Sequence, residues 1–308
     1  MTIVVAGSSG LVGSAIVRYY EGIGQKVIGV NRAVVDLLDS KATTDFLTAT
    51  KPDLVIDAAA KVGGIGANNS FPVEFLNDNL RIQSNLMEAA HKADVARFVF
   101  LGSSCIYPRE CPQPIKEEYL LTGPLEQTNS AYAIAKIAGI ELIKSYRKEF
   151  GRRWISLMPT NLYGPNDNFD LANSHVLPAL IRRFSEASAT STVTLWGSGK
   201  PKREFLHVDD MASAVALCAE NYDDERHLNI GSGVDSTIAE LAQLVAGAAG
   251  FTGEIAWDTS KPDGTPRKVM DVSRVKSLGW SPKISLSDGI AQTIAWYRKA
   301  NAEGVVRK

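Results

Sequence analysis

The sequence has few cysteines, no surplus of basic residues and no long apolar run. Its three cysteines are an odd number without metal-ligand spacing, so neither a disulfide framework nor a metal site is expected. The 33 basic and 34 acidic residues give a formal net charge of -1 without a basic block, which argues against nucleic acid or an anionic membrane as partner. No apolar run approaches a membrane span, and Met1 leads into an apolar strand without the charged start of a signal peptide. We therefore expect a cytoplasmic protein.

The chain contains an alternation of buried-strand and helix patterns. Strands are predicted at residues 3–6, 26–30, 53–60, 97–102, 193–196 and 227–230, and helices after residue 10 and at residues 72–93, 130–149 and 176–184. Strands that alternate with helices over this length predict an α/β fold with a doubly wound parallel sheet of the Rossmann type. Ligands of such sheets bind outside the carboxyl ends of the strands.

A glycine-rich loop follows the first strand directly. Residues 7–13 read Gly-Ser-Ser-Gly-Leu-Val-Gly and lead into a helix pattern. Glycines at this spacing allow a tight turn and a close approach of the backbone to a pyrophosphate at the helix N-terminus. The spacing alone is weak evidence, but its place between a strand and a helix favours a dinucleotide site over a plain tight turn.

The second strand ends at Asn31 and Arg32, where an NAD-preferring site would place a carboxylate for the ribose 2′-hydroxyl. A carboxylate would repel a 2′-phosphate, whereas a guanidinium can pair with one. This favours NADP over NAD as the cofactor, unless Arg32 simply points to water.

Tyr132 and Lys136 lie four residues apart in a predicted helix, and therefore on one face of it. A nearby ammonium lowers the pKa of a tyrosine and makes it a usable proton donor and acceptor. This spacing also occurs by chance in ordinary amphipathic helices. The small residues at 58–60 end one of the other predicted strands and Ser103 follows the next, so they converge with the glycine loop on one sheet edge and favour an active site there.

Longer runs carry a resemblance to a known family. They lie at residues 58–65, 101–108, 132–139, 158–165, 173–176, 203–210 and 261–268. With them the chain resembles the extended short-chain dehydrogenases/reductases over nearly its whole length. Within that family it looks like the GDP-L-fucose synthases, NADPH-dependent 3,5-epimerase/4-reductases of GDP-4-keto-6-deoxy-D-mannose. The glycines and Tyr-x-x-x-Lys mark only the superfamily, whereas Ser-Ser-Cys at 103–105 with Asn-Ser-His at 173–175 marks the synthases.

The resemblance implies a role for each catalytic candidate. Tyr132 protonates the C4 oxygen, Ser103 hydrogen-bonds that oxygen, and Lys136 binds the nicotinamide ribose. Cys105 and His175 act as base and acid in the epimerisations at C3 and C5. A cysteine, with an ordinary pKa of about 8.5, and a histidine, at about 6.5, can exchange protons near neutrality. Cys111 and Cys218 are interpreted as structural.

The resemblance also implies the binding residues and the domains. The NADP site takes Gly7, Ser8, Ser9, Gly10, Leu11, Val12, Gly13, Arg32, Ala58, Ala59, Ala60, Leu101, Gly102, Ser103, Ser104, Tyr132, Lys136, Pro159, Thr160, Asn161, Leu162 and His175. Arg183, Trp196, Arg203 and Asp263 contact the GDP-sugar. The Rossmann domain is placed at residues 1–159 plus about 207–229, and a smaller α/β substrate domain at about 160–206 plus 230–308. A homodimer through helices 72–93 and 130–149 is expected by analogy.

The glycine loop departs from the family pattern at two positions. The family often carries a basic residue inside the glycine loop, where this chain has Ser8 and Ser9, so Arg32 is left to bind the 2′-phosphate alone.

Two alternative functions remain open. Another nucleotide-sugar enzyme, a 4-epimerase or a 4,6-dehydratase, is the first alternative. A dehydratase should show an Asp-Glu pair where this chain has Ser104 and Cys105, and a 4-epimerase needs no Cys105/His175 pair. A non-enzymatic NADP-sensing protein is the second, although it need not keep Ser103, Tyr132 and Lys136 together.

Overall fold

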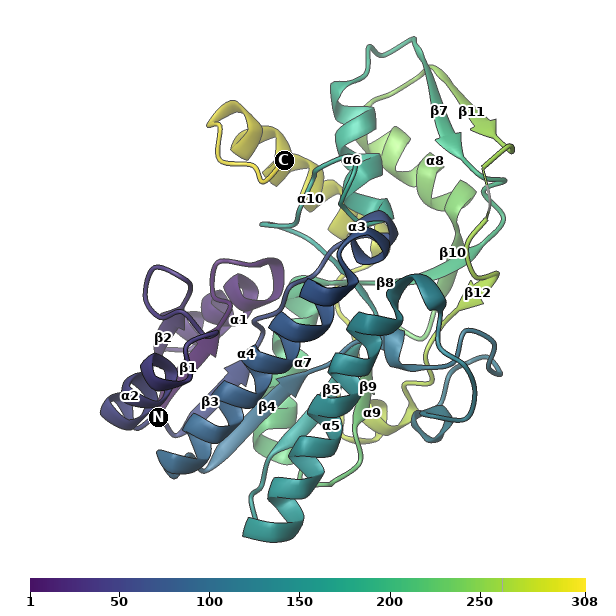
Figure 1. The fold of residues 1–308 in the computed structure, drawn as a ribbon. Helices are drawn as coiled ribbons and strands as arrows, with labels where there is room; N and C mark the ends of the chain where they lie inside the picture. Colours follow the sequence, from purple (N-terminus) through teal and green to yellow (C-terminus); the bar gives the residue numbers. More distant parts are fainter. Residues whose placement is uncertain (262) are drawn as a thin grey trace.

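The computed structural model describes residues 1–261 and 263–308. Pro262, inside the run at 261–268 that carries part of the resemblance, lies outside the described residues. The chain forms a large sheet with helices around it, and a second group of helices and short strands lies at one end of that sheet (Figure 1). Across the described ranges, no helix has the length and apolar character that a membrane crossing requires.

A six-stranded parallel sheet organises the larger part of the fold. Its strand order is β2-β1-β3-β4-β5-β9, and every neighbouring pair is parallel. The strands are β1 (Thr2–Ala6), β2 (Lys26–Val30), β3 (Leu54–Asp57), β4 (Arg97–Leu101), β5 (Ile155–Pro159) and β9 (Leu228–Ile230). All four residues of β3 are buried, because helices cover both faces of the sheet. The predicted parallel sheet is confirmed.

Helices cover the sheet in two layers. On one side, α1 (Leu11–Gly22) packs against α7 (Val208–Asn221). On the other, α4 (Pro72–Lys92) packs against both α2 (Ser40–Thr50) and α5 (Ser130–Phe150), as Figure 1 shows for α4 and α5 in front of the strands. This two-sided cover is the doubly wound arrangement that the sequence predicts.

Helix α5 carries the tyrosine–lysine pair, and its sequence explains how it packs. Ala133, Lys136, Ile140 and Ile143 are buried at the spacing of one helix face. Gly151 ends the helix with a φ of 65°, a left-handed conformation that glycine adopts at little cost. Lys136 therefore lies on the face that packs against the sheet.

The second group of elements comes mainly from the latter part of the chain. Its strands are β6 (Asn161–Tyr163), β7 (Thr192–Trp196), β8 (Lys202–His207), β10 (Asp235–Thr237), β11 (Glu254–Asp258) and β12 (Arg267–Lys268), and the remaining helices are α6 (Val176–Glu186), α8 (Ile238–Ala249), α9 (Ser273–Ser277) and α10 (Leu286–Ala302). Strand β8 pairs with β6, β10 and β12, and β7 pairs with β11. Helices α6, α8 and α10 pack together beside these strands (Figure 1).

Two apolar cores correspond to these groups. The larger core fills the space between the main sheet and its helices, and the smaller one lies among α6, α8 and α10. The chain after residue 230 contributes to both, because Met270, Val272, Val275 and Trp280 join the larger core while Leu241 joins the smaller one. The domain boundaries placed from the sequence remain a prediction.

Some element boundaries differ from the sequence prediction. Strand β3 ends at Asp57 instead of residue 60, so the three alanines lie beyond the strand. A short helix, α3 (Ile65–Ser70), begins after Gly64 and is not among the predicted helices. Helix α2 is not predicted, although Asp39 caps it by accepting from the Ala42 amide at 3.0 Å.

A substitution at Gly139 tests the packing of α5 on β4. A Cβ atom at this position would lie 2.3 Å from Cζ of Phe100. We expect Gly139→Ala to lower the free energy of unfolding by about 1–2 kcal/mol, because the clash outweighs the better helix propensity of alanine. Gly247→Ala in α8 is the matched control, since nothing lies within 4 Å of its Cβ position, and it should raise that free energy by about 0.5–1 kcal/mol. Urea unfolding followed by circular dichroism measures both, and equal gains would contradict the packing described.

Candidate active site

The carboxyl ends of β1, β3, β4 and β5 lie along one edge of the parallel sheet. The loops that leave these strands begin at Gly7, Ala58, Gly102 and Thr160. The amide of Gly102 donates to the Leu157 carbonyl at 2.9 Å, and the amide of Thr160 donates to the Ile230 carbonyl at 3.0 Å. The first bond holds the predicted residues at 101–104 beside β5, and the second holds those at 159–162 beside the end of β9.

The glycine loop has no room for a side chain at its first and last glycines. Gly7 has a φ of 75°, and a Cβ on it would lie 2.6 Å from the Ala58 oxygen. A Cβ on Gly13 would lie 2.1 Å from the Gly7 oxygen. Gly10 is the N-cap residue of α1, so the first amides of this 12-residue helix face the loop. The geometry suits a phosphate group that approaches the backbone.

Arg32 lies just after β2 and is exposed. Within the described ranges its guanidinium forms no hydrogen bond or ion pair, whereas Asn31 caps the local turn by accepting from the Ala33 amide at 2.9 Å. A charged group in this state can bind an anion without first breaking an internal contact.

Ser103 and Cys105 follow β4, Ser103 as the N-cap residue of a short 3₁₀ helix at residues 104–106 and Cys105 within it. The Cys105 amide donates to Oγ of Ser103 at 3.2 Å, and the thiol is half-buried. Tyr107 anchors the end of this loop, because its hydroxyl donates to Oδ1 of Asn229 at 2.5 Å and lies 3.1 Å from Nε2 of His227. The loop is thus tied to the strand at the far end of the sheet order.

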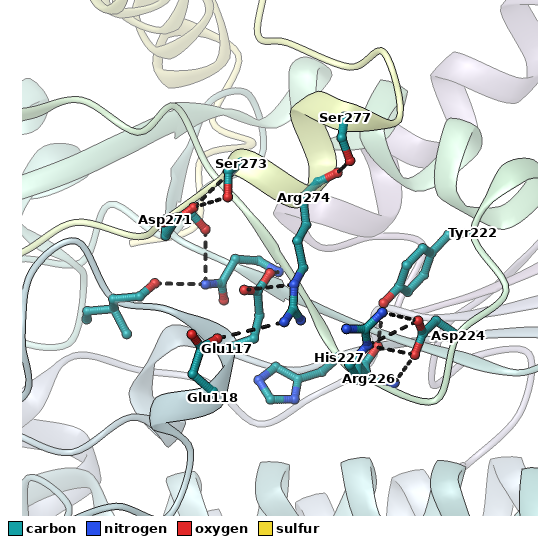
Figure 2. Close-up of polar contacts among 12 residues, drawn as sticks. Glu117, Glu118, Tyr222, Asp224, Arg226, His227, Asp271, Ser273, Arg274 and Ser277 are labelled. Carbon is teal, nitrogen blue, oxygen red and sulfur yellow. Dashed lines mark hydrogen bonds and ion pairs between the residues drawn. The ribbon is translucent and has the colours of Figure 1, made fainter.

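A charged network supports this anchor from the other side. Glu117 accepts from the Asn229 amide at 3.2 Å and lies 3.7 Å from Nε of Arg274. Figure 2 shows Arg274 reaching from α9 toward both Glu117 and Glu118. Burial raises the pKa of the Glu117 carboxyl, and burial also lowers the pKa of His227 to about 4, so the histidine is neutral near pH 7.

Tyr132 lies in the first turn of α5 and is half-buried. Burial raises the pKa of its hydroxyl well above the ordinary value, the negative charge of Cys105 raises the pKa further, and Ser103 lowers it by hydrogen bonding. The prediction that Lys136 lowers this pKa differs from the structure. The Lys136 Nζ donates to the Leu101 carbonyl at 2.9 Å and lies 5.9 Å from the centre of the tyrosine ring.

Asp57, the last residue of β3, is a charged neighbour of Lys136 that sequence reasoning missed. Burial lowers the pKa of Lys136 while Asp57 raises it, and burial raises the pKa of Asp57 to about 6 against the opposing charge of Lys136. Oδ1 of Asp57 accepts from the Ala59 amide at 3.1 Å, and Oδ2 is buried without a partner in the described part of the chain. A carboxylate inside an otherwise apolar strand was the signal available in the sequence.

Asn129 is the second residue that sequence reasoning missed. It precedes α5, and its Nδ2 donates to Sγ of Cys105 at 3.4 Å. Nothing in the sequence marks this contact, since an asparagine before a helix is ordinarily read as a cap.

The segment before His175 meets the sheet edge through the loop after β3. The Gly64 amide donates to the Asn173 carbonyl at 2.8 Å, and a Cβ on Gly64 would lie 2.8 Å from the Ser174 oxygen. His175 itself is solvent-accessible at the start of α6, yet the surrounding protein desolvates it and lowers the pKa of its imidazole. The described residues give it no direct contact with Cys105 or Tyr132.

Three of the four substrate candidates surround the turn after β7. The exposed Trp196 ring lies 5.8 Å from Nζ of Lys261, and Asp263 accepts from the Ser198 amide at 2.9 Å. Arg203 donates to the Thr265 carbonyl at 2.6 Å. Arg183 lies separately, on α6, and has no polar side-chain contact with the other three among the described residues.

Known proteins show strong similarity to this chain. Residues 3–231 match the sequence model of the NAD dependent epimerase/dehydratase family. The chain is 52% identical over 305 residues to the GDP-L-fucose synthase of Escherichia coli (strain K12), with 95% of each chain covered. It is 54% identical over 300 residues to GDP-L-fucose synthase 1 of Arabidopsis thaliana, covering 96% of this chain and 93% of the relative. A crystal structure of a GDP-L-fucose synthetase from Naegleria fowleri bound to NADP superposes with a TM-score of 0.90 at 29% identity, covering 100% of this chain and 96% of that one.

Asp57 gives the stability of the protein a pH dependence. Its pKa rises on folding from 3.8 to about 6, so its contribution to stability is complete below pH 3.8 and is lost as the pH rises through about 6. We expect Asp57→Asn to raise the free energy of unfolding by about 2 kcal/mol near pH 8, with little gain near pH 4. Urea unfolding at the two pH values measures the difference in free energy of unfolding between the variant and the parent protein. The same substitution at the exposed Asp36 is the control. An equal difference at both pH values would contradict a penalty for ionising Asp57.

Proposed function

The chain belongs to the NAD dependent epimerase/dehydratase family, and on this basis we propose that it is an NADPH-dependent enzyme of the GDP-L-fucose synthase type. Its reactions are the epimerisation of GDP-4-keto-6-deoxy-D-mannose at C3 and C5 and the reduction of the C4 ketone. The observation that carries the proposal is the placement of Ser103 and Cys105, joined by a 3.2 Å hydrogen bond, on the loop after β4 that packs against α5, the helix that carries Tyr132. The identities of 52% and 54% to GDP-L-fucose synthases support the choice of substrate.

The residues present fit NADPH as the cofactor. The glycine loop turns tightly at the N-terminus of α1, which suits a pyrophosphate close to the backbone, and the guanidinium of Arg32, without a polar partner among the described residues, suits a 2′-phosphate. The small side chains of the three alanines at 58–60 suit a cofactor lying across the strand end, and Lys136 is proposed to bind the nicotinamide ribose. When bound, NADPH supplies the hydride that reduces the ketone carbon.

Epimerisation uses Cys105 and His175 on opposite faces of the sugar. The thiolate of Cys105 takes a proton from the carbon next to the ketone, and the electron pair of the broken C–H bond moves onto the carbonyl oxygen. Ser103 and Tyr132 donate hydrogen bonds to this enolate oxygen. His175 returns a proton to the carbon from the other face.

Reduction uses the same oxygen site. Tyr132 gives its proton to the C4 oxygen as the ketone becomes an alcohol. The raised pKa of Tyr132 keeps its hydroxyl protonated near neutrality, so the proton is present when it is needed. Trp196, Arg203 and Asp263, with Arg183, are proposed to hold the GDP end, since guanidinium groups suit a diphosphate and an aromatic ring packs on a base or sugar.

We also propose a homodimer through α4 and α5. These helices pack on one another, and Val73, Ile134 and Phe150 on them are exposed apolar residues. Association of two copies would cover this surface. Light scattering of the purified protein measures the mass, and a monomer at micromolar concentration would exclude the dimer.

The decisive experiment is to incubate the purified protein with NADPH and GDP-4-keto-6-deoxy-D-mannose while following the absorbance of the nicotinamide. We expect oxidation of NADPH in proportion to the sugar consumed, with a product inverted at C3 and C5 by NMR. A product inverted only at C4 would indicate the 4-epimerase alternative. Binding of NADPH without turnover would favour the sensing protein.

Cys105→Ser tests the proposed base. Because a hydroxyl is a much weaker proton acceptor near neutrality than a thiolate, solvent deuterium incorporation at C3 and C5 should fall by about 100-fold or more. NADPH binding should be unchanged. Cys111→Ser is the matched control and should exchange at the wild-type rate, since Cys111 lies outside the proposed site. Exchange by Cys105→Ser at the wild-type rate would show that the base is misassigned.

Arg32→Ala tests the cofactor preference. Loss of the guanidinium should raise the KM for NADPH by about tenfold with little change in kcat, because a charge-assisted contact to the 2′-phosphate is lost. The KM for NADH, which lacks that phosphate, serves as the internal control and should stay the same. An equal change for both cofactors would exclude a 2′-phosphate contact by Arg32.

A further inference from the structure

Asn129 is the N-cap residue of α5, and its side chain does not cap the helix. An asparagine at this position ordinarily accepts a hydrogen bond from a backbone amide in the first turn. Here Oδ1 is buried without a partner in the described part of the chain, and Nδ2 donates to Sγ of Cys105 at 3.4 Å. The side chain therefore contacts the loop that follows β4 in place of the first turn of α5.

We propose that Asn129 is a positioning residue for Cys105, which holds the sulfur in place and favours its anionic form. This inference rests on the proposed function, in which Cys105 takes a proton from carbon. An N–H group forms a stronger hydrogen bond with an ionised acceptor than with a neutral one, so the contact favours the thiolate over the thiol. A buried acceptor without a partner is a local departure of the kind that folds accept at functional sites.

The surroundings of the sulfur leave this role to Asn129. The Cys105 amide donates to Ser103, which fixes the loop, and α5 packs against the 3₁₀ helix that contains Cys105. Of the ionisable groups nearby, Tyr132 is a neutral hydroxyl whose pKa the charge of Cys105 raises. Lys136 is occupied by the Leu101 carbonyl, and Glu126, just before Asn129, pairs with Arg109 at 3.4 Å. Among the described residues, Asn129 is the one whose side-chain N–H donates to the sulfur.

Two substitutions separate this role from a structural one. Asn129→Ala removes the donor. Asn129→Asp keeps the shape and places a good capping group at the N-terminus of a 21-residue helix, where a negative charge is also favoured by the helix dipole. A purely structural role predicts that Asn129→Asp is harmless. The proposed role predicts that it is the more damaging change, because a carboxylate next to the sulfur opposes a second negative charge.

The readout is the rate of alkylation of Cys105 by iodoacetamide as a function of pH, measured by mass spectrometry of the full-length protein. Cys111→Ser is included in every variant, because Cys111 is half-buried whereas Cys218 is fully buried. Thr128→Ala is the matched control, since the neighbouring Thr128 hydroxyl bonds to Glu126 at 3.3 Å and not to the sulfur. This readout needs no sugar substrate.

We expect Asn129→Ala to slow alkylation near pH 7 by about three- to tenfold and to move the midpoint of the pH profile upward by about half a unit to one unit. Asn129→Asp should move the midpoint at least as far while its urea unfolding stays at or above that of the parent. Thr128→Ala should keep the parent profile. Parent profiles for both Asn129 variants would overturn the proposal, and Asn129→Asp alone decides it if Asn129→Ala does not fold.

Solvent deuterium exchange at C3 and C5 of the sugar supplies a second readout. Both Asn129 variants should lower kcat for exchange by about three- to tenfold at pH 7, the loss shrinking as the pH rises and the thiolate fraction recovers. A loss that does not depend on pH would overturn the proposed stabilisation of the anion. If the parent protein exchanges no deuterium, the proposed function fails, and the alkylation profiles still decide the coupling of Asn129 to Cys105.

Discussion

The hydrogen bond from Nζ of Lys136 to the Leu101 carbonyl fixes the geometry on which the site depends. A hydrogen bond from a charged donor contributes about 1.5–3 kcal/mol, and this one ends on the last residue of β4. It sets the position of α5 along β4. Tyr132 lies one turn before Lys136 in that helix, and Ser103 and Cys105 come directly after β4. A slip of α5 by one residue would break the bond and separate the tyrosine from the serine and the cysteine.

The ionisable side chains at the carboxyl edge of the sheet change one another's pKa. The negative charge of Cys105 raises the pKa of Tyr132, so an ionised sulfur favours a protonated phenol. Asp57 and Lys136 stabilise each other's charged forms against the burial of both. In the proposed function, one oxygen-binding site serves an enolate and then an alkoxide, because the raised pKa of Tyr132 keeps its hydroxyl protonated for both steps.

Much of this site follows from sequence pattern, and the rest depends on how side chains turn in the folded chain. Gly13 could be predicted because the backbone that its Cβ would meet, at Gly7 and Ser8, lies within a few residues along the chain, whereas Gly7 meets Ala58 in the loop after β3 and is predicted from the glycine spacing alone. The carboxyl-edge position of Ser103 follows from strand–helix alternation. The contact between Asn129 and Cys105 joins two loops 24 residues apart, and local rules assign the asparagine to capping. The unpaired oxygen of Asp57, which costs about 1–3 kcal/mol to bury, depends on what packs around it.

The return of the chain into the larger core has a consequence for how such enzymes recombine. Met270, Val272, Val275 and Trp280 pack with the strands of the N-terminal sheet, while Arg274 between them meets Glu117 behind the Cys105 loop. A crossover that exchanged everything after residue 230 for a foreign sequence would remove four apolar residues from the first core and one charge from the support of that loop. Replacement of the latter part of the chain by a foreign one therefore requires that the segment at 270–280 still match the larger core.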